Sequence, residues 1–285
     1  MRPIHIVTDS TCDIPAEILR QYNITVVSLY VTLDGEALSD DQITPQEIFA
    51  HTERTGKLPQ TTAIAPQDMM DEAQRWIDDG YDVLYIGLSS GVSACHSIGL
   101  MLEKEFEPGR FTAFDTKRLS SAVGLMAIRA ARMVQQGMDV PTMLPLLTDM
   151  TNRMHTSFFL DQVQYLHYGG RCSTVQLLGA NLLKLRPMIL MPDGKLVAGD
   201  KLRGSVERCV ELYLQKILPD WQVIQGPEVA LCWSGGCEQA FELIEKAVRE
   251  NRPDLEILKS TACNVISCHC GPGTIGLLFE TKPKG

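Results

Sequence analysis

Three hydroxyl-rich segments are predicted to lie at one edge of a parallel sheet, where its strands end. In an open α/β sheet ligands bind at this edge, and neutral hydroxyl groups donate hydrogen bonds to anions. Ser93 is predicted at or near a helix N-terminus, where backbone N–H groups and the helix dipole favour an anion. For any one of these residues a role as cap or turn residue is the commoner case, but together they predict a carboxylate or phosphate site. The segments are Ser10-Thr11, Thr61-Thr62, and Ser89-Ser90 with Ser93.

A second group of residues suits an amphipathic ligand. The pair Gly169-Gly170 predicts a tight turn, and Arg171 follows directly, so its fork of N–H donors has a fixed position. Leucines then recur with helical spacing over 177–185, and Pro187 predicts the end of that helix. An arginine beside a leucine-rich helix fits a ligand with an anionic head and an apolar body. The alternative is a structural turn whose arginine is only solvated.

One histidine is a further candidate for anion binding. His269 is predicted where a strand over 256–268 meets the turn Gly271-Pro272-Gly273. The glycines allow the backbone to fold tightly around the imidazole, which can donate a hydrogen bond to an anion. The alternative is a structural histidine, which is the commoner case for a histidine standing alone.

Familiar nucleotide-binding and zinc-binding motifs are absent. The sequence has no G-x-x-x-x-G-K-[ST] and no G-x-G-x-x-G after the first strand. The candidate metal ligands are Cys263, Cys268, His269 and Cys270, with Cys232 and Cys237 upstream, but their spacing differs from that of zinc fingers and ribbons. Cys268 and Cys270 would also point to opposite faces of the predicted strand. No metal site is therefore predicted.

Length and composition narrow the class of protein. A chain of 285 residues predicts two domains, and a net charge of −9 argues against a nucleic-acid partner. No apolar run is long enough for a membrane span, and the N-terminus lacks the apolar core of a signal peptide. Nine scattered cysteines suggest reduced thiols. A cytoplasmic location is expected.

The order of elements predicts an α/β domain over 1–156 and a smaller α+β domain over 157–285. Strands alternate with helices in the first part, which predicts a parallel, doubly wound sheet with helices on both faces. Strands and hairpins mix in the second part, including a hairpin around Pro192-Asp193-Gly194, which predicts a mixed sheet. A ligand cleft is expected between the domains. The predicted strands cover 4–10, 24–33, 82–88, 111–116, 156–161, 188–191, 195–200, 227–235, 256–268 and 274–280.

Several motifs in fixed order make the chain resemble the DegV family of bacterial fatty-acid-binding proteins, the carrier subunits of fatty acid kinase. The resemblance covers essentially the whole chain. Three positions depart from the family pattern, Ala63, Ile64 and Ala94, and they leave open which threonine binds the ligand. The motifs are IVTDSTCDIP near the N-terminus, TTAIAP (61–66), LSSGVSACHS (88–97), FDTKRLSSAVG (114–124), YLHYGGR (165–171), LLKLRPMI (182–189), KLRG (201–204) and HCGPGTIG (269–276).

The resemblance implies a two-domain fold that buries a long-chain fatty acid at the domain interface and needs no other cofactor. Thr61 or Thr62, together with Ser93 and His269, would bind the carboxylate. Arg171 and Arg203 would lie at the head-group end, where a fatty acid kinase subunit receives the ligand and makes acyl phosphate for phospholipid synthesis. Such a carrier is not itself an enzyme, and transient contact with a membrane is compatible with it. The alternatives are an enzyme acting on a small acyl or phosphorylated substrate, and a lipid-sensing regulatory protein.

Overall fold

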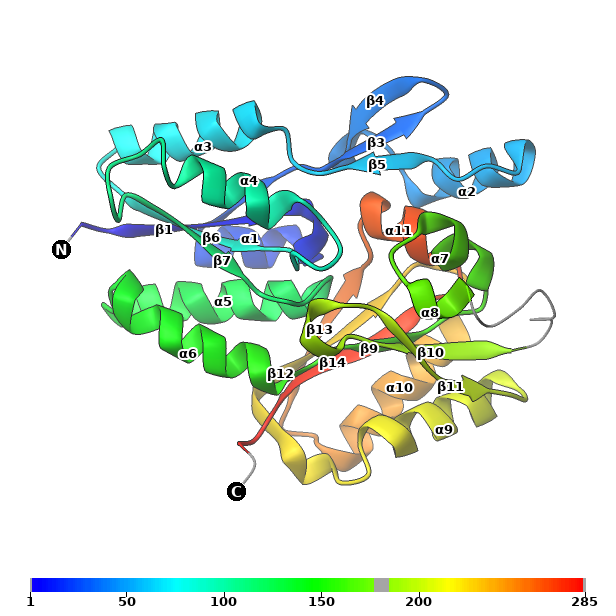
Figure 1. Cartoon of the computed structure of the whole chain (residues 1–285). Helices are drawn as coiled ribbons and strands as arrows, with labels where there is room; N and C mark the ends of the chain where they lie inside the picture. The colour runs from blue at the N-terminus through cyan, green and yellow to red at the C-terminus, as the bar shows by residue number, and fades with distance from the viewer. Residues whose placement is uncertain (1, 177–184, 284–285) are drawn as a thin grey trace.

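The computed structural model describes residues 2–176 and 185–283, which are arranged around three sheets (Figure 1). The first sheet is parallel, with the strand order β2-β1-β6-β7. Its central strands are almost wholly buried, as expected for a parallel sheet covered by helices on both faces. The chain passes from β1 to the edge strand β2 and later crosses to β6, so the switch point lies between β1 and β6. The strands are β1 (Ile4–Asp9), β2 (Ile24–Val27), β6 (Asp82–Gly87) and β7 (Phe111–Asp115).

Helices cover both faces of the parallel sheet. The helices α3 (Pro66–Asp78) and α4 (Cys95–Leu102) pack on one face, and α1 (Ala16–Tyr22) and α5 (Ser121–Gln135) pack on the other (Figure 1). The helix α6 (Val140–Arg153) lies against α5. This arrangement confirms the predicted doubly wound α/β fold.

The helix α5 lies between the parallel sheet and a second, mixed sheet (Figure 1). It contacts β1, β2 and β6 on one side and β12 and β14 on the other. Eleven of its 15 residues are buried, because its sequence is apolar on all sides and rich in alanine. Small side chains allow two sheets to approach the same helix.

The mixed sheet has the order β11-β10-β9-β14-β12-β13, and β8 pairs with β14 outside this path. The strands β12 and β13 are parallel, and the other pairs are antiparallel. The helices α9 (Val206–Ile217) and α10 (Glu238–Asn251) pack on the face away from α5, which confirms the predicted mixed sheet. The strands are β8 (Met154–His155), β9 (Ser157–Phe159), β10 (Arg186–Leu190), β11 (Val197–Leu202), β12 (Ile224–Trp233), β13 (Glu256–Thr261) and β14 (Ile275–Thr281).

A small antiparallel sheet, β4-β3-β5, was not predicted. The predicted strand over 24–33 breaks at Ser28 and Leu29, and β3 leaves the parallel sheet to pair with β4 and β5. The dipeptide Asp34-Gly35 forms the β3–β4 turn, with positive φ at both residues, as in a tight hairpin. The strands are β3 (Tyr30–Leu33), β4 (Glu36–Ser39) and β5 (Gln60–Thr62).

Short helices close this end of the molecule. The helix α11 (Asn264–Cys270) contacts α2 (Pro45–Thr55), α7 (Val163–Gly169) and the strands β3 and β5. A helix from the C-terminal part of the chain therefore packs on the small N-terminal sheet. The helix α8 (Ser173–Gln176) follows α7.

The predicted strand over 256–268 is wrong beyond Thr261. The chain turns there and forms α11, because two side chains satisfy the first N–H groups of that helix. Asp40 Oδ1 accepts a hydrogen bond from the N–H of Val265 at 2.7 Å, and Cys263 Sγ accepts one from Ile266 at 3.5 Å. His269 consequently lies on a helix, and the argument that Cys268 and Cys270 point to opposite faces of a strand does not hold.

The predicted leucine-rich helix falls largely on residues 177–184, outside the described residues. Within residues 2–176 and 185–283, no helix has both the length and the apolar character needed to cross a bilayer. No group of three or more His, Cys, Asp or Glu side chains in the same residues could hold a metal ion.

The close packing of α5 leads to a prediction at Gly124. A Cβ atom at this position would lie 2.5 Å from the carbonyl oxygen of Cys12 and 2.8 Å from Cγ1 of Ile14. Helix propensity alone would make Gly124→Ala stabilising by about 1 kcal/mol. Because the clash involves backbone, we expect the free energy of unfolding to fall by about 1–3 kcal/mol instead. Urea unfolding measures it, with Gln135→Ala at the exposed end of α5 as the control; a stabilised Gly124→Ala variant would contradict the packing.

Candidate functional site

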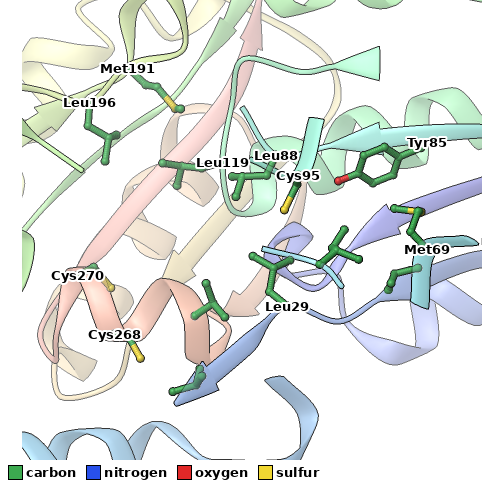
Figure 2. Close-up of a cluster of buried hydrophobic side chains, with 14 of the residues drawn as sticks. Leu29, Met69, Tyr85, Leu88, Cys95, Leu119, Met191, Leu196, Cys268 and Cys270 are labelled. Carbon is green, nitrogen blue, oxygen red and sulfur yellow. The ribbon is translucent and has the colours of Figure 1, made fainter. Parts of the chain in front are cut away.

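A cavity of about 590 Å³ lies between the small sheet, the loops after the parallel strands and the helix α11. We call it the His269 cavity. Its walls are mainly apolar, and Figure 2 shows five of the lining side chains around it. These five come from separate parts of the chain: Leu29, Leu88, Leu119, Leu196 and Cys270.

The polar wall of this cavity contains a hydrogen-bonded pair from two distant segments. Thr61 lies on β5 and His269 on α11, and Thr61 Oγ1 is 2.8 Å from His269 Nε2. The other ring nitrogen, Nδ1, is buried and has no hydrogen-bond partner among the described residues. Gly169 packs against the ring so closely that a Cβ atom there would lie 2.5 Å from Nδ1. A glycine is therefore required at the end of α7.

His269 is a neutral donor or acceptor at physiological pH. Burial and, to a smaller extent, the nearby Arg171 guanidinium together lower its pKa to about 3. The pair Thr61–His269 thus offers hydrogen bonds without a full charge.

Ser93 also lines the His269 cavity, two residues before the start of α4. Its Oγ accepts a hydrogen bond from the N–H of Cys95 at 3.3 Å and lies 3.1 Å from the Cys95 thiol. A thiol is a weak acceptor. The Ser93 hydroxyl can therefore turn toward a ligand at little cost.

The two predicted arginines are placed differently. Gly170 ends α7 with a φ of 70°, and Arg171 follows it, lines the cavity and donates from Nη1 to the carbonyl oxygen of Gly169 at 2.8 Å. Arg203 is exposed after β11 and does not line the cavity. Of the six predicted residues, the structure brings Thr61, Thr62, Ser93, Arg171 and His269 to one cavity and leaves Arg203 outside it.

Other predicted hydroxyl groups have structural partners instead. The Thr11 hydroxyl bonds to Asp9, the Ser90 hydroxyl donates to Asp115 at 2.6 Å, and Ser89 donates to the carbonyl oxygen of Gly194 at 2.8 Å. Thr61 and Thr62 were predicted at the edge of the parallel sheet, but they lie on β5 of the small sheet. This segment is therefore a strand of the small sheet, and it lines the His269 cavity.

A second cavity of about 370 Å³ adjoins the first, and sequence analysis did not predict it. We call it the Ser120 cavity. Leu119, Phe158, Ile266 and Cys270 line both cavities. The hydroxyl groups on its wall are occupied within the protein: Ser234 donates to the carbonyl of Gly271 at 2.6 Å. Such a wall is effectively apolar despite its residue types.

Comparison with known proteins assigns the chain to a family. A family model described as "Uncharacterised protein, DegV family" matches residues 3–282. The chain belongs to the DegV family. The resemblance seen in the sequence motifs is confirmed.

Individual relatives of this DegV chain are similar over their full lengths. A fatty acid-binding protein of Thermotoga maritima is 28% identical over 289 residues, covering 99% of each chain. A DegV family protein from Thermus thermophilus, whose structure concerns fatty acid binding, is 28% identical with a TM-score of 0.91, covering 99% of this chain and 100% of that one. The fatty acid kinase B3 protein of Streptococcus pneumoniae, loaded with linoleic acid, shares the fold with 16% identity and a TM-score of 0.82, covering 98% and 99%.

The low pKa of His269 leads to a prediction for the ligand-free DegV chain. Because the folded-state pKa of about 3 lies below the ordinary value of 6.5, His269 contributes stability above the unfolded pKa. That contribution is lost as pH falls from the unfolded pKa toward the folded one. In His269→Asn the free energy of unfolding should therefore decline less steeply between pH 6 and 4, by up to about 1.4 kcal/mol per pH unit.

Denaturant unfolding across this pH range tests the prediction. Burial also lowers the pKa values of His5 and His155 to about 4. Their titration therefore adds the same pH dependence of stability to the wild type and to His269→Asn. Parallel pH profiles of the wild type and His269→Asn would mean that His269 titrates normally in the folded protein.

Proposed function

We propose that this protein binds one long-chain fatty acid with the carboxylate at the Thr61–His269 pair. The observation that carries the proposal is a pair of neutral hydrogen-bonding groups at one wall of an otherwise apolar cavity. The names of the Thermotoga maritima and Thermus thermophilus relatives support it. A small polar substrate would leave most of this apolar wall without a partner.

The acyl tail would extend from the His269 cavity into the Ser120 cavity. Burial of about 16 methylene groups at about 0.8 kcal/mol each contributes on the order of 13 kcal/mol before ordering costs are subtracted. The tail therefore supplies the affinity, and the polar end fixes the direction of the ligand.

The carboxylate would be held by hydroxyl groups and not by a buried cation. A carboxylate transferred into an apolar cavity must keep hydrogen bonds. We propose that His269 donates from Nε2 to Thr61 Oγ1, so that the Thr61 hydroxyl donates its own proton to the ligand. This tautomer leaves a lone pair, and not an N–H group, unpartnered at the buried Nδ1. Ser93 supplies the second donor.

Thr61 is the better candidate of the two threonines. Neighbouring side chains on a strand point to opposite faces. Thr61 points toward His269, while Thr62 is exposed. The pair therefore offers a matched comparison on one strand.

Lipid extraction followed by titration with palmitate and oleate tests fatty-acid binding. We expect about one fatty acid per purified chain. Loss of a hydrogen bond to a charged group costs about 1.5–3 kcal/mol, so Thr61→Val, Ser93→Ala and His269→Ala should each weaken binding roughly ten- to hundredfold. Thr62→Val, the control, should change affinity less than about twofold. A wild type that neither carries nor takes up fatty acid would refute the function, and equal losses in the two threonine variants would refute the assignment to Thr61.

We further propose that the protein presents the carboxylate to a fatty acid kinase subunit. The fold likeness to the Streptococcus pneumoniae fatty acid kinase B3 protein suggests this partner. Arg171 is exposed, lines the His269 cavity and sits on a glycine turn, so its guanidinium is available both to the ligand end and to a docked protein. Arg203 is exposed outside the cavity, which suits a contact with the partner alone.

Acyl-phosphate formation with a fatty acid kinase and ATP tests the presentation role. Arg171→Ala should reduce turnover at least tenfold while fatty-acid affinity and melting temperature are largely retained. Arg171→Lys should restore little activity, because lysine lacks the planar fork of donors. Arg203→Ala, which is away from the cavity, should raise the kinase concentration needed without changing fatty-acid affinity. Wild-type turnover in both alanine variants would exclude the role.

A further inference from the structure

We propose that Asp13 is a positioning residue that shapes the wall of the Ser120 cavity and so sets the affinity for the longest acyl tails. The inference rests on the proposed fatty-acid binding. It concerns the end of the cavity system away from the carboxylate, and Asp13 itself lines neither cavity.

Asp13 joins three elements that meet at the Ser120 cavity. Its Oδ1 accepts a hydrogen bond from the N–H of Cys263 at 2.8 Å, just before α11. Its Oδ2 accepts one from Ser120 Oγ at 2.5 Å, at the start of α5, and one from the Cys232 thiol on β12 at 3.6 Å. Ser120 and Cys232 are both lining residues of the cavity. One carboxylate therefore fixes two wall positions, one just before the helix α5 and one on the strand β12.

Ser120 needs such a partner because its backbone is strained. Its φ of 57° and ψ of −149° lie in a region that is close to exclusive to glycine. A non-glycine residue stays in that region only where its surroundings hold it there. The Ser120 side chain is held by its 2.5 Å hydrogen bond to Asp13 and by a longer contact of 3.3 Å with Cys232 Sγ.

The charge state of Asp13 decides the direction of this hydrogen bond. Asp13 is 7% exposed, and its three hydrogen-bond donors in the described part of the chain are uncharged. An ionised carboxylate only accepts, which matches three donors. Burial raises the pKa of Asp13 to about 7, so the protonated form is accessible near neutral pH. A proton on Oδ2 would reverse or break the bond from Ser120.

Other titratable groups lie near Asp13, but no cation of the described residues forms an ion pair with it. Asp40, at the start of the 3-10 turn Asp40–Gln42, raises the pKa of Asp13. Asp13, Asp41 and Lys259 of β13 line one groove at the surface, but Lys259 pairs with Glu245 at 2.7 Å. Burial keeps the neighbouring thiols protonated, with pKa values raised well above the ordinary one: Cys12, Cys232, Cys263 and Cys270.

The test measures affinity for saturated acids of twelve to eighteen carbons. Asn in Asp13→Asn keeps the acceptor for Cys263 and replaces Oδ2 by a donor, so it imitates the protonated acid. Loss of one ordinary hydrogen bond predicts binding of the eighteen-carbon acid about three- to tenfold weaker, with less than about twofold change for the twelve-carbon acid. Asp41→Asn, the control for charge, removes an exposed carboxylate from the same groove and should change neither.

Two further measurements separate positioning from simple support of the fold. Ser120→Ala should reproduce the chain-length effect, and the double variant should lose no more than either single one, because both remove the same bond. In the wild type, affinity for the eighteen-carbon acid should fall as pH is lowered from 8 to 6, and Asp13→Asn should show no such change. If Asp13→Asn does not fold, Ser120→Ala carries the test alone.

Three results would overturn the inference: equal losses at every chain length, additive losses in the double variant, or unchanged binding in both single variants. Each would leave fatty-acid binding by the wild type intact. A wild type that binds no fatty acid would instead remove the proposed function and this inference together.

Discussion

The fold depends on burying one helix between two sheets. The helix α5 packs on the parallel sheet with one face and on the mixed sheet with the other, so a shift of the helix would disturb both sheets at once. Small residues permit this contact, and Gly124 allows the backbone near Cys12 to lie against the helix. Charged residues toward its C-terminal end strengthen the constraint, because Arg132 binds Glu228 through both carboxylate oxygens at 2.7 and 2.8 Å, and Glu228 is buried. Removing one partner of such a pair would leave an uncompensated buried charge, which is strongly destabilising.

The same constraint positions the cavities. Leu119 and Ser120 directly precede α5, and between them they line both cavities. The position of the helix therefore fixes this part of the cavity walls.

The protein also buries carboxylates of its own with neutral donors. Asp9 is wholly buried and accepts hydrogen bonds from the Tyr85 hydroxyl and the N–H of Leu88, each at 2.8 Å, and burial raises its pKa. A ligand carboxylate at Thr61 and His269 would be treated in the same way. In both cases neutral hydroxyl and N–H groups satisfy the oxygens of a buried carboxylate that has no cation beside it.

The sequence predicted the elements well where a local pattern decides the structure. The alternation of strands and helices indicated the parallel sheet, and the hairpin at Pro192-Asp193-Gly194 is present between β10 and β11. The errors lie where contacts distant in sequence decide. Val265 and Ile266 favour a strand, but Asp40 caps the helix α11 from more than two hundred residues away. The break after β2 likewise has no strong local signal, and the turn at Asp34-Gly35 was not predicted. Five of the six predicted site residues meet at one cavity, but the sequence could not show that Thr61 and His269 bond to each other, nor that a second cavity adjoins the first.

These two omissions have one cause. Thr61 and His269 are 208 residues apart, and they meet because the small sheet leaves the parallel sheet and packs on α11. The Ser120 cavity likewise forms where the start of α5, strand β12 and the segment before α11 converge. Residue types along the chain indicate which groups can bind an anion, whereas the depth and shape of the space beside them depend on how separate layers pack. Asp13 illustrates the difference: in the sequence it is a residue near a predicted helix start, whereas in the fold it accepts hydrogen bonds from Ser120, just before α5, and from Cys232 of β12 at the wall of the Ser120 cavity. The residue types that can bind a carboxylate can therefore be recognised in the sequence, whereas the space available to an apolar tail depends on how the layers pack.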